Sequence, residues 1–183
     1  LQHGIAIPFA NQPPPEEELK PVGMAANFAC RRLMKPSRMA TAAERHAGLG
    51  LDSYTRVTSP LRRYPDLLTH QQIRSHLRGD ALLGEEEVTR RIGAAAVASA
   101  AVRRAERFSN QHWKLAWLKR QNRWRGEAVV VALEERKAML MLPELALECR
   151  VRRTAAMELD QLLRVEVTGV DFIDLEARLR ILE

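Results

Sequence analysis

Two adjacent arginines lie between two prolines in the segment Thr58-Ser59-Pro60-Leu61-Arg62-Arg63-Tyr64-Pro65-Asp66-Leu67. Each proline fixes its own φ and disfavours the helical region for the residue before it, so the loop between Pro60 and Pro65 is expected to be stiff. Arg62 and Arg63 carry planar, permanently charged groups that bind phosphate or carboxylate oxygens in pairs. The segment therefore predicts a phosphate clamp, with a solvated surface pair as the alternative.

A helix is predicted directly behind the two arginines. Pro65 suits the first helical position, Asp66 suits the positively charged first turn, and Gly79 can end the helix. His70 lies on this helix, and Ser59 could orient the loop through its hydroxyl group or its backbone. Tyr54 and Tyr64 flank the loop and could stack on a base or bind a phosphate, although core packing is an equal alternative.

The chemistry of hydrolysis needs more than this loop supplies. A two-metal phosphoryl-transfer site requires several converging carboxylates, whereas Asp52 and Asp66 stand alone near the arginines. Ser59 has histidines within the same region but no nucleophile-elbow motif, so a catalytic serine is disfavoured. If the protein hydrolyses phosphodiesters, we expect its metal ligands to lie upstream of this chain.

The positive charge of the chain is concentrated between residues 101 and 125, which hold eight basic residues and one acidic residue. All three tryptophans also lie there, and basic residues interleaved with aromatic ones are typical of a nucleic-acid path. Packing of the tryptophans against a neighbouring domain is the alternative, and the two interpretations are compatible. The residues of the predicted RNA path are Arg103, Arg104, Arg107, Lys114, Lys119, Arg120 and Arg123.

The elements that position these residues predict an α+β chain of two domains. Residues 1–21 indicate an extended connector, residues 22–34 a core helix, Tyr54–Thr58 a strand, and residues 85–121 one long helix or a helical hairpin. Beyond Gly126 the pattern changes to short β-rich runs that suit a small five-stranded OB-type barrel. The predicted strands are Ala128–Leu133, Ala138–Leu142, Leu145–Val151, Leu163–Val170 and Ile173–Leu182.

Net charge, cysteine content and hydrophobicity indicate which partners and which cellular location to expect. The formal net charge of +6 favours an anionic partner, yet residues 126–183 hold twelve acidic and eight basic residues, so RNA contact there would need a local patch such as Arg150, Arg152 and Arg153. Cys30 and Cys149 lie far apart and predict reduced thiols. No apolar run approaches the length that a membrane-spanning helix needs, so a cytoplasmic protein without membrane contact is expected. The sequence starts at Leu1 rather than at a methionine, which suggests a fragment.

Residues 46–70 resemble the signature near the end of the catalytic RNB domain of ribonuclease II and ribonuclease R exoribonucleases. Its core, Thr-Ser-Pro-Leu-Arg-Arg-Tyr-Pro-Asp-Leu, is nearly the family pattern, with Leu61 where isoleucine is common. The resemblance assigns residues 1–122 to the C-terminal portion of the RNB domain. It assigns residues 123–183 to an OB-fold domain of the ribosomal-protein RNA-binding type, although the acidity of this domain departs from that role.

The resemblance implies a magnesium-dependent exoribonuclease that degrades single-stranded RNA processively from the 3′ end to nucleoside monophosphates. By position, Arg62 matches the arginine that contacts the scissile phosphate, while Ser59, Arg63, Tyr64, Asp66 and His70 match supporting positions. Magnesium would be bound mainly by an upstream part of the protein, in the same or a separate polypeptide. A non-catalytic RNA-binding or scaffolding member without the metal site is the alternative.

Overall fold

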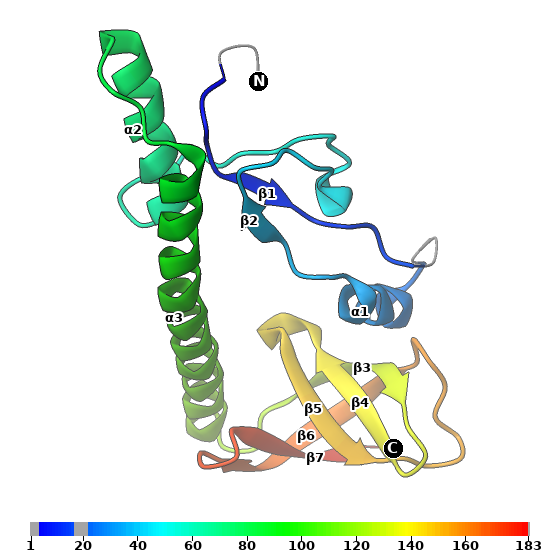
Figure 1. Ribbon diagram of the computed structural model, residues 1–183. Coiled ribbons are helices and arrows are strands. Elements are labelled where there is room, and N and C mark those ends of the chain that lie inside the picture. Colours follow the sequence, from blue (N-terminus) through cyan, green and yellow to red (C-terminus); the bar gives the residue numbers. More distant parts are fainter. Residues whose placement is uncertain (1–3, 17–21, 183) are drawn as a thin grey trace. The chain divides into compact units, whose positions relative to one another are not determined.

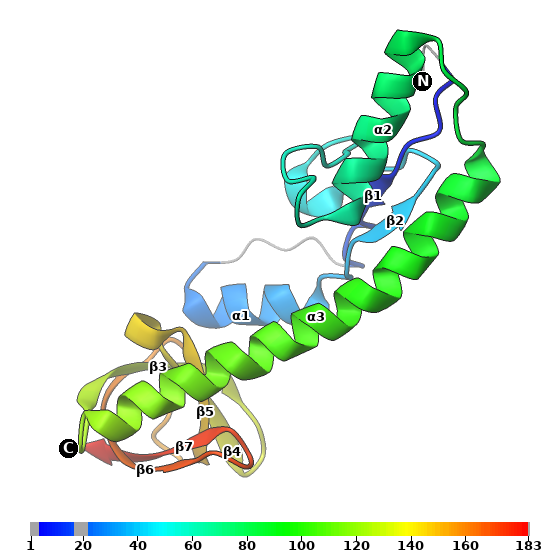
Figure 2. The same ribbon diagram turned by 90° about the vertical axis from the view of Figure 1, so that its left-hand side faces the viewer.

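The computed structural model describes residues 4–16 and 22–182, which form two compact units. Unit 1 comprises residues 1–17 and 34–103, and unit 2 comprises residues 18–33 and 104–183. Both units are drawn in Figures 1 and 2. The chain is α+β, with helices followed by a five-stranded antiparallel, nearly closed barrel, as the sequence predicts.

Unit 1 is built around the helix that follows the two arginines. This helix, α2 (Tyr64–Arg78), begins one residue before the predicted start and ends at Gly79, whose φ of 73° suits glycine. Leu68 of α2 packs with Val88 and Ile92 of the first turns of α3 (Glu85–Arg120). Buried Gln72 donates to the carbonyl oxygens of Ala6 and Leu83 and accepts from the Leu83 amide, so polar bonds also hold α2 in place.

Two local predictions for unit 1 are wrong. Residues 4–16 are not only a connector, because Phe9–Asn11 forms the buried strand β1, which pairs antiparallel with β2 (Arg38–Ala40). The predicted strand Tyr54–Thr58 does not form a ladder. Its extended backbone accepts one bond from the Ala10 amide at Tyr54, and the Thr55 hydroxyl donates to the Pro8 carbonyl. β-rich composition alone does not supply a pairing partner.

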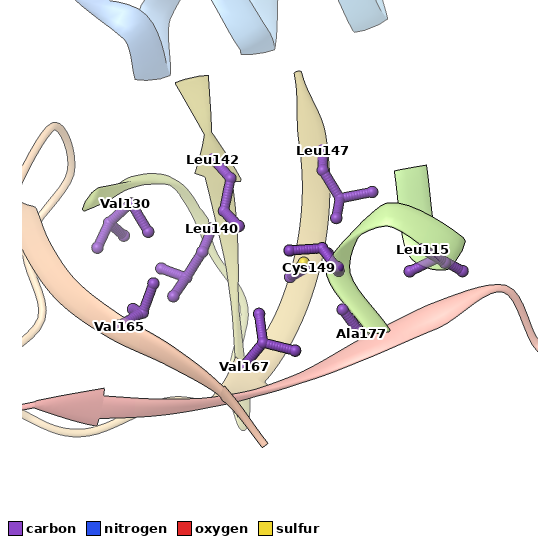
Figure 3. Close-up of a cluster of buried hydrophobic side chains, with 11 residues drawn as sticks. Leu115, Val130, Leu140, Leu142, Leu147, Cys149, Val165, Val167 and Ala177 are labelled. Carbon is purple, nitrogen blue, oxygen red and sulfur yellow. The ribbon is translucent and has the colours of Figure 1, made fainter. Parts of the chain in front are cut away.

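The barrel of unit 2 has the five strands that the sequence predicts. Their order is β5-β4-β3-β6-β7, and every neighbouring pair is antiparallel. Alternate residues of the strands point inward, including Val130, Leu140, Leu147 and Val165, which meet in the core shown in Figure 3. The strands are β3 (Arg125–Leu133), β4 (Lys137–Leu142), β5 (Leu147–Arg152), β6 (Leu162–Asp171) and β7 (Glu176–Leu182).

The helix α3 is one continuous element of 36 residues, so the alternative of a helical hairpin is excluded. Leu115 and Leu118 in its last turns are fully buried in the core of the barrel, which Leu115 enters in Figure 3. Trp124, just after the helix, packs on the same core. Among the helices of the described residues, none has both the length and the apolar character that a membrane crossing requires.

The short helix α1 (Met24–Leu33) packs on the barrel of unit 2. Buried Phe28 contacts Val129 and Val131, which point outward from β3. The Asp160 carboxylate accepts a 2.7 Å hydrogen bond from the Ala25 amide in the first turn, where an anion is favoured. The predicted core helix is therefore confirmed, but the surface that it covers could not be read from its sequence.

Candidate nucleic-acid interface

The two adjacent arginines have different environments. Arg63 donates to Asp66 Oδ2 through Nε at 3.1 Å and through Nη2 at 2.8 Å, and Nη2 also donates to the Thr58 hydroxyl at 3.0 Å. The Asp66 side chain is completely buried, so this ion pair lies at the base of the loop. The Arg63 guanidinium is thus committed to holding the loop.

The backbone of the loop is fixed by the same carboxylate. The Ser59 amide donates to Asp66 Oδ2 at 2.9 Å, and the Ser59 carbonyl accepts from the amides of Arg62 and Arg63. His70 Nε2 donates to the Val57 carbonyl at 2.6 Å, which ties the loop to α2. Ser59 and His70 therefore contribute to the shape of the loop, Ser59 through its backbone.

Arg62 lies at the exposed end of this fixed turn. No carboxylate among the described residues pairs with it, in contrast to Arg63. A rigid backbone that presents an unpaired guanidinium is suited to an external anion, because little conformational freedom remains to be lost on binding.

Arg62 and Arg63 line a groove of about 660 Å³ within unit 1. Three further arginines line it: Arg38 beside β1, Arg56 before the loop, and Arg103 on α3. The only carboxylate in the lining is that of Asp66, which Arg63 already neutralises. The groove therefore has a strong positive potential that suits a polyanion.

The rest of the lining leaves room for a chain-like ligand. One wall is formed by small residues of α3, among them Gly93, Ala96 and Ser99. The buried Ser37 hydroxyl and Asp66 Oδ1 also belong to lining residues, and neither atom finds a hydrogen-bond partner among the described residues. Such unsatisfied groups are uncommon in folded proteins and indicate a place where a ligand or water completes the bonding.

The two tyrosines near the loop differ in exposure. Tyr54 is half-buried, and its ring packs edge-on against His46 with 5.5 Å between ring centroids. Tyr64 is 38% exposed. Of the pair, Tyr64 is the one with a free ring surface.

The residues of the predicted RNA path do not share one environment. Arg103 belongs to the groove of unit 1, whereas Arg107 and Lys114 line a pocket of about 570 Å³ in unit 2. Lys114 donates to the Ala146 carbonyl, and Lys119 lies over the Phe172 ring at 5.2 Å. Arg104 lies over the Phe108 ring at 5.4 Å, Arg123 is 4.0 Å from Glu166, and Arg120 is exposed.

The three tryptophans are also in different settings. Trp124 packs on the barrel core, whereas Trp113 is 67% exposed and Trp117 is 42% exposed. The packing interpretation is thus correct for Trp124. Trp113 and Trp117 leave aromatic surface available on α3.

No group of three or more metal-ligating side chains occurs among residues 4–16 and 22–182. In the groove, Asp66 would be the first choice as a ligand for a hard cation, but its Oδ2 already accepts three hydrogen bonds. The described residues therefore do not fit a magnesium site of their own.

Two groove residues were missed from the sequence. Arg38 and Arg56 are isolated basic residues, and only the pairing of β1 with β2 and the path of the loop bring them to the groove. The separation of roles between Arg62 and Arg63 did have a signal. An arginine and an aspartate three positions apart at a helix start are neighbours on one face, which marks Arg63 as the structural member.

Comparison with known proteins agrees with this organisation. Residues 14–79 match the RNB domain, and residues 124–182 match the C-terminal S1 domain of RNase II-type exonucleases. An uncharacterized ribonuclease of Synechocystis sp. is 36% identical over 93% of this chain and 27% of its own length. The chloroplastic/mitochondrial ribonuclease II of Arabidopsis thaliana is 27% identical over 80% of this chain and 20% of its own length.

Solved structures share the fold. Ribonuclease R of Mycoplasma genitalium, in complex with ribose-methylated single-stranded RNA, matches 99% of this chain and 38% of that chain with a TM-score of 0.71 and 16% identity. An active-site mutant of the Dss1 exoribonuclease of Candida glabrata matches 100% of this chain and 26% of that chain with a TM-score of 0.80 and 16% identity.

The chain spans about a quarter of the length of these curated relatives. It carries part of an RNB domain followed by an S1 domain of the OB type, which is an RNA-binding domain. The domains of this chain and its relatives are therefore those of the ribonuclease II and ribonuclease R family.

Proposed function

We propose that this chain is part of an exoribonuclease that hydrolyses single-stranded RNA processively from its 3′ end to nucleoside monophosphates. In this proposal residues 1–122 are the end of the RNB domain and residues 123–183 are the S1 domain. The observation that carries the proposal is the groove of unit 1, in which Arg62 has no ion-pair partner among the described residues and lies on a fixed loop beside four other arginines. The relative of Mycoplasma genitalium, which contains RNA, supports RNA as the ligand.

Arg62 is proposed to contact the phosphate that is cleaved. A guanidinium donates two parallel hydrogen bonds to phosphoryl oxygens, and these bonds strengthen as negative charge builds on the oxygens in the transition state. Arg63 acts indirectly, because its bonds to Asp66 hold the backbone from which Arg62 projects. Arg63 is therefore a positioning residue.

The other arginines of the groove are proposed to hold adjoining phosphates. Arg38, Arg56 and Arg103 line the same cavity, and each phosphate that they neutralise releases condensed counterions. Tyr64 offers an exposed ring for a base, whereas Tyr54 supports the fold through His46. The other residues of the predicted RNA path belong to unit 2.

RNB-family enzymes generally depend on magnesium. Because the described residues do not fit a magnesium site, we place the metal ligands in the preceding part of the RNB domain. When bound there, magnesium would activate water and neutralise phosphate charge. This chain alone is then expected to bind RNA without digesting it.

The test compares Arg62→Ala with Arg74→Ala in a polypeptide that contains the preceding RNB segment together with this chain. Arg74 is an exposed arginine of α2 outside the groove, so it controls for loss of one charge. RNA labelled at the 3′ end should release labelled nucleoside monophosphate at once, and RNA labelled at the 5′ end should persist until a short end product appears. We expect Arg62→Ala to lower kcat about 10²- to 10³-fold, as for other transition-state donors, with a much smaller loss of RNA affinity.

Equal losses of affinity and turnover in Arg62→Ala would contradict a transition-state role. If the parent polypeptide binds RNA but releases no nucleotide in the presence of magnesium, the protein is instead a non-catalytic RNA-binding member of its family.

A further inference from the structure

In an OB barrel, nucleic acids usually bind on the outer face of the second and third strands. In this chain those strands are β4 and β5, and α1, which packs mainly on β3, also contacts side chains of both strands. Phe28 packs against Met139 and Met141 of β4, and Arg31 donates to Glu148 of β5 at 2.5 Å. Part of the usual RNA face of this barrel is therefore taken up by α1.

The outer face of β3, β6 and β7 carries a row of charged side chains. Arg125, Glu166 and Arg180 are register partners across these three neighbouring strands. Both arginines donate to Glu166 Oε2 at 3.1 Å, and Arg123 lies 4.0 Å from Oε1. Glu166 is 1% exposed, whereas the arginine side chains are 60–75% exposed.

This cluster keeps an excess of positive charge. The hydrogen bond from Arg180 and the charges of Arg180 and Arg125 lower the pKa of Glu166, so its carboxylate is ionised. One negative charge then faces three guanidinium groups, which are ordered by the carboxylate but point their remaining donors to solvent. Ordered, exposed guanidinium groups form an anion site with little entropy left to lose on binding.

A cavity of about 290 Å³ lies beside the cluster. Its lining includes Arg125 of β3 and Arg164 of β6, together with Glu127. Arg164 has no ion-pair partner among the described residues. The cavity thus adds a fourth guanidinium and a recess next to the other three.

We propose that the β3–β6–β7 face, marked by Arg123, Arg125, Arg164 and Arg180, binds the phosphodiester backbone of single-stranded RNA. The choice of RNA as ligand rests on the proposed function, and the face itself rests on charge complementarity and on the position of α1. Phe172 is the only aromatic residue from 126 to 183, and Lys119 covers its ring, so contact is with phosphates rather than bases. Binding at this face is accordingly independent of base sequence and sensitive to salt.

The test measures binding of a fluorescein-labelled oligouridylate to this chain by fluorescence anisotropy at several salt concentrations. The double variant Arg123→Gln/Arg164→Gln removes two charges and leaves Arg125 and Arg180 bonded to Glu166. The matched control, Arg136→Gln/Lys137→Gln, removes two charges from exposed residues between β3 and the start of β4. We expect the first variant to lose affinity about tenfold near 0.1 M salt and to lower the salt slope by about 1.4, with little change in the control.

Two further single variants each remove one carboxylate, and the one at the face should strengthen RNA binding. Because a gain of affinity is expected, loss of stability cannot explain the result. Glu127→Gln removes the exposed carboxylate from the cavity, and Glu135→Gln removes an exposed carboxylate outside it. Glu127→Gln should tighten RNA binding severalfold, and Glu135→Gln should not. RNA that contains 4-thiouridine should cross-link to peptides from residues 162–182.

Equal effects of the two double variants, or cross-links confined to residues 137–152, would overturn the proposal while leaving the groove of unit 1 untouched. Weak binding of RNA with tight binding of an acidic protein at the same face would also overturn it. Conversely, failure of the parent polypeptide to digest RNA would leave the expected anisotropy result intact, so the two proposals fail separately.

Discussion

Removing the Arg63 guanidinium should unfold the loop of the groove, whereas removing its neighbour should not. Arg63→Ala leaves the completely buried Asp66 carboxylate without its cationic partner and without two of its three hydrogen bonds. Breaking a buried pair on one side costs about 3–5 kcal/mol. Because 31% of the Arg63 side chain is exposed, we expect a loss near the lower end, about 3 kcal/mol.

The matched variants separate charge, shape and position. Arg62→Ala removes the adjacent exposed arginine and should change the free energy of unfolding by less than about 0.5 kcal/mol. Asp66→Asn keeps an acceptor for Ser59 and Arg63 and should cost less than Arg63→Ala. The double variant Arg63→Ala/Asp66→Asn should be more stable than the sum of the single losses predicts, because it leaves no uncompensated charge.

Hydrogen exchange of the peptide that covers α2 is the suitable assay, because all three tryptophans lie in unit 2. A loss of about 3 kcal/mol should speed amide exchange of α2 more than about a hundredfold. Tryptophan fluorescence during urea unfolding reports on unit 2 and should not change. Equal effects of Arg62→Ala and Arg63→Ala, or strict additivity of the double variant, would refute the separation of roles.

Two further predictions concern titratable groups away from the groove. Hydrogen bonds from Arg90 and then Arg91 lower the pKa of Glu87 from 4.5 to about 2, so its contribution to stability is complete above pH 4.5 and is lost as the pH falls toward 2. Glu87→Gln should therefore make the stability of the start of α3, measured by hydrogen exchange, less dependent on pH between about 2 and 4.5. An unchanged dependence on pH would contradict the role given to Glu87. Burial raises the pKa of Cys149 to about 12, so this thiol should react with a disulfide reagent only after the barrel unfolds, whereas half-buried Cys30 should react in the folded protein.

The barrel was predictable because its signal is local. Along β5, buried Leu147 and Cys149 alternate with exposed Glu148 and Arg150, and this period of two is visible in the sequence. The strand predicted at Tyr54–Thr58 has the right composition, yet no neighbouring strand lies in register with it. Conversely, β1 lies in a proline-rich segment and forms because β2, far along the chain, pairs with it. Pairing between distant segments is the information that local composition lacks.

The position of the loop was predictable from the sequence, and the spacing of Arg63 and Asp66 indicates which arginine is bonded within it. The two prolines and the two arginines correctly indicate a fixed loop before a helix, and the structure has that loop. The complete burial of Asp66, which makes its ion pair with Arg63 important for stability, is a tertiary property that this spacing does not show. The covering of β4 by Phe28 is likewise tertiary, because an apolar stripe on α1 predicts burial but does not name the surface that it buries.

The ratio of arginines to carboxylates explains what each charged cluster can do. At Arg63 and Asp66 the ratio is one to one, so the pair is neutral and its bonds fix the loop that carries Arg62. At Glu166 three arginines share one carboxylate, so the same kind of bond orders the guanidinium groups and still leaves positive charge for a ligand. A carboxylate in an RNA-binding surface is thus not a defect of that surface. It fixes the cations in place, and the surface attracts phosphate as long as the arginines outnumber it.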